Sequence, residues 1–136
     1  MRLPVALGAP IVALGVLIVA LAPRPARAED MPKALLPELI ATEHALCRTS
    51  VGYGQRFVQF VDVRGDGRRG VLLDYSDAMC GGVPQSFCDG SGCLIRVYAN
   101  DKGAWRKVYD GHARGWRVEK AEGKAALTID GKRLGG

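Results

Sequence analysis

Residues 57–76 constrain the fold most strongly, because they predict a β-hairpin. Two apolar runs rich in Val and Phe flank a loop, residues 62–70, that holds three Gly and two Asp. Strand-forming runs on either side of a Gly- and Asp-rich loop are typical of a strand, a turn and a second strand. We therefore expect an antiparallel pair of strands here, around which the rest of the chain is arranged.

The loop resembles the aspartate-rich loops that bind calcium in EF-hands and in FG-GAP-like repeats, where alternate residues supply oxygen ligands. Asp62 and Asp66 match the first and fifth positions of such a loop. Arg64 stands at the third position and Gly70 at the ninth, and neither supplies a carboxylate. Two interpretations stay open: a calcium-stabilised loop that uses Asp62 and Asp66, or a tight turn in which these two carboxylates cap backbone amides.

Residues 1–28 have the features of an export signal. Arg2 precedes an apolar run over residues 5–22, and two prolines lead to the sequence Ala-Arg-Ala at residues 26–28. This order predicts cleavage before Glu29, although the apolar run is also long enough for an uncleaved anchor. The mature chain is therefore expected in the periplasm or outside the cell, with no membrane contact after cleavage.

The mature chain, residues 29–136, is expected to carry little net charge. The full sequence has 19 Lys and Arg and 14 Asp and Glu; three of the arginines lie in residues 1–28, which leaves 16 against 14, or +2. Nucleic-acid binding draws on a concentrated basic field, so no nucleic-acid partner is expected. The remaining 108 residues are expected to form a single small domain with a modest core.

The four cysteines are expected to form two disulfides, because an even number of cysteines in a small exported domain favours disulfides over free thiols. We favour Cys47 with Cys80 and Cys88 with Cys93, since the Gly-Ser-Gly between the latter two lets the chain fold back. Three pairings are nevertheless compatible with the sequence. A zinc site at Cys88 and Cys93 is the competing interpretation, although no second close pair of cysteines accompanies it.

The expected fold class is α+β, with one N-terminal helix packed on an antiparallel β-meander of about six strands and held by disulfides. Pro37 suits the first turn of a helix that runs to about residue 48. Two strands belong to the hairpin, and the others are expected at residues 93–99, 104–110, 115–120 and 124–130. At helical spacing, one apolar stripe should contain Leu39, Ile40, Leu46 and Cys47, with His44 partly buried near the same side.

Part of the chain resembles a set of small exported bacterial proteins. The residues that carry this resemblance are the loop at 62–67, the strand after it, the segment Phe87-Cys-Asp-Gly-Ser-Gly-Cys93 and the run Trp105-Arg-Lys-Val-Tyr109. The likeness covers about residues 47–119. It implies an exported, cysteine-bridged protein of a single domain, and it implies no activity.

Strand alternation predicts a candidate binding face on residues 93–99 and 104–110. Alternate side chains of a strand share a face, which is expected to bring aromatic rings and cations together. Such a face would stack sugars or bind anionic polymers. The alternative is that the helix covers the rings, with the cations at its edges. The residues of this expected face are Arg96, Tyr98, Trp105, Lys107 and Tyr109.

No catalytic group can be nominated from spacing. His44 and His112 have no nucleophile motif nearby, and the carboxylates are too scattered to define an acid and base pair. The leading hypothesis is therefore a non-enzymatic binding or inhibitory module of the cell envelope, without a cofactor, whose partner is an envelope protein or polysaccharide. A calcium-stabilised structural domain that uses Asp62 and Asp66 is the second hypothesis, and a small hydrolase is the third.

Overall fold

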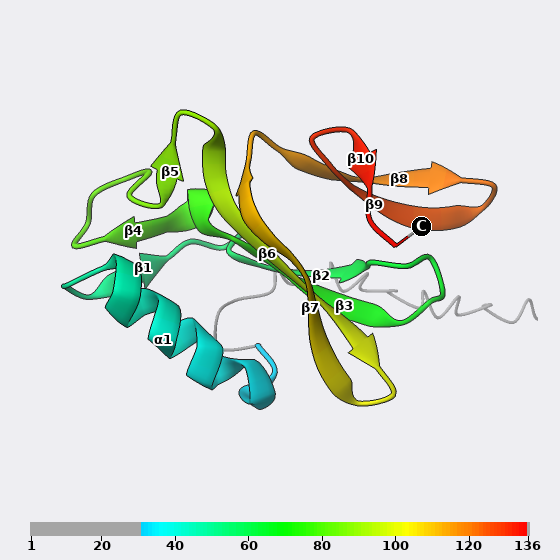
Figure 1. Ribbon diagram of the computed structural model, residues 1–136, viewed down its shortest axis with the longest axis horizontal. Coiled ribbons are helices and arrows are strands. Elements are labelled where there is room, and N and C mark those ends of the chain that lie inside the picture. The colour runs from blue at the N-terminus through cyan, green and yellow to red at the C-terminus, as the bar shows by residue number, and fades with distance from the viewer. Residues whose placement is uncertain (1–30, 136) are drawn as a thin grey trace, which may run out of the picture.

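The computed structural model describes residues 31–135, so the expected signal at residues 1–28 lies outside the described residues. Within them the chain forms one α-helix and ten β-strands, and the paired strands all run antiparallel (Figure 1). The α+β class, with one N-terminal helix and antiparallel sheets, is confirmed.

The helix α1 (Leu36–Leu46) follows a 3-10 turn over Lys33–Leu35, and Pro37 lies in its first turn as expected. Proline suits this position because its missing N–H would have no partner inside the helix. The buried face of the helix contains Leu39 and Thr42. The Thr42 hydroxyl donates to a backbone carbonyl one turn earlier, at 2.9 Å, which satisfies a polar residue inside the interface.

The expected apolar stripe of the helix is wrong in part. Leu39 and Cys47 are buried, but Ile40 is 49% exposed and Leu46 is 55% exposed. His44, expected to be partly buried, is exposed. Successive helix residues point about 100° apart, so a helix that buries Leu39 turns its neighbour Ile40 toward solvent.

The main sheet contains β2 (Val58–Asp62), β3 (Arg69–Asp74), β6 (Gly92–Asp101) and β7 (Ala104–Ala113) in this order, with β5 (Cys88–Asp89) beside the start of β6. The expected hairpin forms its first two strands, and their register pairs Val58 with Leu73. Residues 70–74 of β3 are all buried. The strand is therefore covered on both faces.

The remaining strands form two smaller sheets. The first contains β8 (Trp116–Ala121), β9 (Lys124–Ile129) and β10 (Lys132–Arg133), and the second pairs β1 (Val51–Tyr53) with β4 (Ala78–Cys80). The sequence did not predict β1, β4, β5 or β10. Each has only two or three residues, which is too short for a periodic pattern, so distant partners decide whether it forms.

The main sheet lies between two apolar clusters, because its side chains alternate between its faces. In β3, Leu73 belongs to the cluster that contains Leu39 of the helix, whereas Leu72 belongs to the cluster that contains Leu127 of β9. Figure 1 shows the same arrangement, with α1 on one side of the crossing strands β6 and β7 and the β8–β9 hairpin on the other. The chain thus forms three layers.

Two disulfides are present, with the pairing that the sequence favoured. Cys47–Cys80 joins the end of α1 to β4, with a Cα–Cα distance of 5.6 Å and a sequence separation of 33 residues. Cys88–Cys93 closes the turn between β5 and β6, at a separation of 5 residues. No described cysteine is free.

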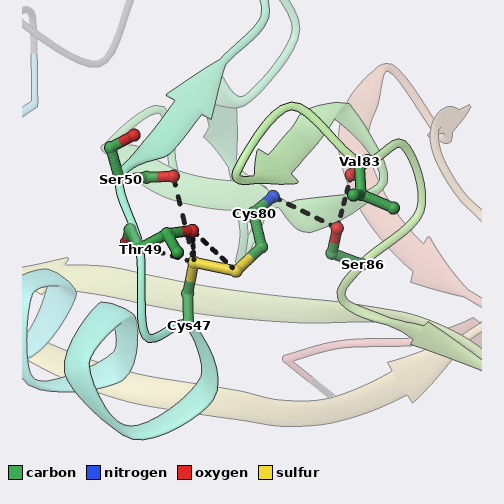
Figure 2. The surroundings of a disulfide bond; sticks show 6 residues. All are labelled: Cys47, Thr49, Ser50, Cys80, Val83 and Ser86. Atoms are coloured by element: carbon green, nitrogen blue, oxygen red, sulfur yellow. Dashed lines mark hydrogen bonds between the residues drawn. A yellow bond between two sulfur atoms is a disulfide. The ribbon is translucent and has the colours of Figure 1, made fainter.

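Polar contacts surround the longer disulfide (Figure 2). The backbone N–H of Cys80 donates to the Ser86 hydroxyl at 3.1 Å, and that hydroxyl donates to the carbonyl of Val83. On the other side, Thr49 lies beside both sulfur atoms. The disulfide therefore anchors the exposed loop at residues 81–86 as well as the helix.

Candidate functional site

The expected binding face on β6 and β7 is not one face in the structure. The pairing of these strands shifts at a β-bulge: Val97 is opposite Tyr109, but the next residue, Tyr98, is opposite Lys107. Val108 is therefore the extra residue. Directly opposed residues share a face of the sheet, so Lys107 lies on the face of Tyr98 while Tyr109 lies on the other face.

Burial separates the aromatic residues further. Tyr98 is 2% exposed and belongs to the cluster on the helix side, against which Trp105 also packs. Tyr109 packs against the other cluster, with Leu127 of β9. The prediction of a shared exposed face is therefore wrong. The bulge reverses the alternation after Val108, and the helix covers the ring of Tyr98, as the alternative interpretation held.

The cations of that face connect the helix to the sheet. The Lys107 ammonium group lies 2.6 Å from the Glu38 carboxylate of α1 and 2.8 Å from Asp110, and Arg96 lies 3.0 Å from Asp110. Hydrogen bonds to Asp110 and Glu38 raise the pKa of Lys107. Partial burial opposes ionisation of Asp110, but the hydrogen bonds from Lys107 and Arg96 outweigh it and lower the pKa of that carboxyl. Lys107 and Arg96 are therefore ion-paired with carboxylates inside the fold.

The Asp62 loop is built as a turn whose carboxylates bind backbone amides. Asp62 accepts N–H groups from Gly65 at 2.7 Å, Asp66 at 3.2 Å and Gly67 at 2.8 Å. Asp66 accepts the N–H of Arg68 at 2.9 Å. Within residues 31–135, no group of three or more His, Cys, Asp and Glu side chains is placed to hold a metal ion.

We expect Asp62→Ala to lower the free energy of unfolding by about 1 to 3 kcal/mol, because three amides lose their acceptor. Asp66→Ala removes one such bond and should cost less. Urea unfolding in EDTA and in millimolar calcium measures both effects, and the native curves should coincide in the two buffers. A calcium-dependent gain that Asp62→Ala abolishes would instead support the calcium hypothesis.

The structure brings one polar cluster together that bears on the hydrolase hypothesis. Asp89 accepts the Ser91 hydroxyl and backbone N–H, and its other oxygen lies 3.6 Å from Nε2 of His112. The Ser91 hydrogen bonds lower the pKa of Asp89. In a catalytic triad the histidine lies between the serine and the carboxylate. Here the carboxylate lies between the other two, so this arrangement does not activate the serine.

A concave site lies where the main sheet meets the start of β8. It has a volume of about 460 Å³ and is bounded by residues from both. We call it the Trp116 cleft. Residues that define its floor, wall and rim include Arg56, Asp74, Ser76, Ile95, Arg114 and Trp116.

A hydrogen bond fixes the wall of the Trp116 cleft to its floor. The indole N–H of Trp116 donates to Asp74 at 2.8 Å, and the other oxygen of Asp74 accepts the backbone N–H of Ser76 at 3.0 Å. Asp74 is only 9% exposed, at the end of the buried strand β3. Both residues are thus held in place before any ligand arrives.

A second hollow of about 370 Å³ lies beside the first and shares Arg114, Gly115 and Trp116 with it. Asp130 accepts the backbone N–H groups of Arg114 at 2.9 Å and Gly115 at 3.1 Å. The segment that separates the hollows is therefore fixed on both sides: the indole is bonded to Asp74 and the backbone to Asp130.

This site was not predicted from the sequence. Asp74 and Trp116 are 42 residues apart, so nothing local indicates that they meet. Two signals were present. A carboxylate ends the apolar run Val71-Leu-Leu-Asp74, and the segment Arg114-Gly-Trp-Arg117 places a tryptophan between arginines.

Comparison with known proteins adds no relative: no family model, no curated protein and no solved structure matches the chain. The resemblance to small exported bacterial proteins therefore stays an expectation. Within residues 31–135, no helix has the length and apolar character needed to cross a membrane.

Proposed function

We propose that this chain is an exported, non-enzymatic binding module of the cell envelope and that the Trp116 cleft is its contact surface. The observation that carries the proposal is the fixed indole of Trp116, bonded to Asp74 between two hollows. An aromatic ring offers broad contact area, and a ring that is already fixed loses little conformational entropy on binding.

The chemistry of the cleft favours recognition over reaction. Its carboxylate, Asp74, already accepts two N–H groups, and its cysteine, Cys93, is in a disulfide. The exposed guanidinium groups of Arg56 and Arg114 border the same hollow and would bind and orient a polar ligand. The expected export signal at residues 1–28 and the two disulfides support a location outside the cytoplasm.

Single-tryptophan variants test this proposal. The chain has two tryptophans, so Trp105→Phe leaves Trp116 as the only one, and Trp116→Phe leaves Trp105. With solubilised bacterial envelope polysaccharide, we expect the emission of Trp116 to shift and its quenching by acrylamide to fall. The emission of Trp105 should not change, because that ring packs against the core beside the helix.

Two controls accompany this experiment. Melting temperatures check that both variants are folded, and mass spectrometry of the polysaccharide checks that it is not cleaved. A response of Trp105 in place of Trp116 would contradict the proposed site. Cleavage of the polysaccharide would contradict a non-enzymatic function and support the hydrolase hypothesis.

A further inference from the structure

We infer that the Trp116 cleft binds an acidic saccharide, a sugar chain whose units carry carboxylate groups. This inference rests on the proposed function and names the ligand class for the same site. It follows from three features of the cleft: exposed guanidinium groups at the rim, an aromatic wall, and a carboxylate on the floor whose oxygens keep unused lone pairs.

The rim supplies cations that the fold leaves available. Arg56 and Arg114 are exposed and line the cleft. Among residues 31–135, no carboxylate lies within ion-pair distance of either guanidinium. Their backbones are fixed, since the N–H of Arg56 donates to Asp77 at 2.7 Å and that of Arg114 to Asp130 at 2.9 Å. A guanidinium matches a carboxylate with two parallel hydrogen bonds.

The wall and floor supply what a sugar ring requires. The half-buried indole of Trp116 presents apolar area against which the C–H face of a sugar would pack. A carboxylate has about four acceptor positions. Asp74 uses one on each oxygen, for the Trp116 indole and the Ser76 amide, so others remain for sugar hydroxyls.

The same carboxylate argues against a phosphate ligand. A phosphate group that reached both arginines would bring its charge close to Asp74, which also lines the cleft, and like charges repel. A uronic acid separates its charge from its hydroxyl donors. Its carboxylate would meet Arg56 or Arg114, while a hydroxyl would meet Asp74.

The two hollows suit more than one sugar unit. Their volumes, about 460 and 370 Å³, fall in the range of small-molecule sites, and Trp116 borders both. Arg117 lines the second hollow and is exposed, although its guanidinium pairs with Glu119. Consecutive units would therefore lie on either side of the indole, with Arg114 beside both.

Calorimetric titration of the folded chain with tri-galacturonic acid tests the inference. The carboxyl-reduced trisaccharide and inorganic phosphate are the matched ligands. We expect saturable binding of the acid, and at least about tenfold weaker binding of the reduced sugar and of phosphate. The reduced sugar lacks the carboxylates that would form charge-assisted hydrogen bonds with the guanidinium groups, and phosphate lacks the ring that would pack on the indole. Arg56→Gln and Arg114→Gln should each lower the affinity for the acidic trisaccharide about tenfold. Arg106 is exposed on β7 and lines neither hollow, so Arg106→Gln should leave the affinity for the acid unchanged.

The outcomes separate this inference from the proposed function. Equal binding of the acid and the reduced sugar would overturn the acidic class, and equal binding of phosphate would overturn the saccharide. If no probe binds while envelope polysaccharide still shields Trp116, the ligand class is wrong and the binding module stands. If no probe binds in the calorimetric titration and envelope polysaccharide leaves the emission of Trp116 unchanged, both are wrong. Unchanged melting temperatures of the arginine variants exclude loss of the fold as the cause.

Discussion

The double variant Cys47→Ala/Cys80→Ala is expected to lose about 3 to 4 kcal/mol of unfolding free energy. The disulfide joins cysteines at a sequence separation of 33 and connects the end of α1 to β4. Without it the unfolded chain gains the conformational entropy of the loop between the two cysteines. The helix also loses its covalent link to β4 of the two-stranded sheet. Its amides should therefore exchange with solvent faster than those of β3.

The matched control removes the other disulfide. Cys88–Cys93 has a sequence separation of only 5, and the chain-entropy estimate gives about 2 kcal/mol for Cys88→Ala/Cys93→Ala. Urea unfolding of both double variants under oxidising conditions measures the difference. If the short disulfide contributes as much as the long one, loop entropy is not the main source of stabilisation.

Gly92→Ala is expected to cost about 2 to 5 kcal/mol, from backbone strain together with overpacking. Gly92 has φ +128°, a conformation that residues with a Cβ rarely adopt. A Cβ there would lie 2.1 Å from the carbonyl oxygen of Ala113. Because backbone on β7 must move, the change should also displace Arg114 at the edge of the Trp116 cleft and weaken ligand binding.

The control for this substitution lies in the same turn. A Cβ on Gly90 would meet no atom within 4 Å, and this residue has no positive φ. Gly90→Ala should therefore leave the unfolding free energy within about 0.5 kcal/mol of the native value. Equal destabilisation by the two substitutions would show that the turn, rather than the contact with Ala113, is responsible.

The part of the fold that follows local rules could be predicted from the sequence. The hairpin at residues 57–76 has strand-forming runs around a Gly-Asp loop, and Pro37 indicates the start of the helix. Both are present. The strands β1 and β4 could not be predicted, because three residues carry no periodicity and pairing depends on a partner far along the chain.

The error over the binding face has a specific physical cause. A bulge at Val108 adds one residue to β7, and every side chain beyond it changes face. Alternation read from the sequence therefore put Tyr109 beside Lys107, whereas the structure puts them on opposite faces. No residue type in β7 indicates where this bulge lies. Its position is seen only from the register of β7 against β6.

The Trp116 cleft could not be predicted for a related reason. Its floor comes from the end of β3 and its wall from the start of β8, so it exists only once the β8–β9 hairpin packs on the main sheet. The sequence supplied the residue types, and tertiary packing supplied the site.

The most direct test of the account is a heteronuclear NMR titration of the ¹⁵N-labelled chain with soluble envelope polysaccharide. The indole N–H groups of Trp105 and Trp116 give separate signals and report on the two candidate surfaces. The account predicts the largest shifts at the Trp116 indole and at the amides of Ser76 and Arg114, with little change at Trp105. Shifts confined to Trp105 and its neighbours on β7, or no shifts at saturating polysaccharide, would contradict it.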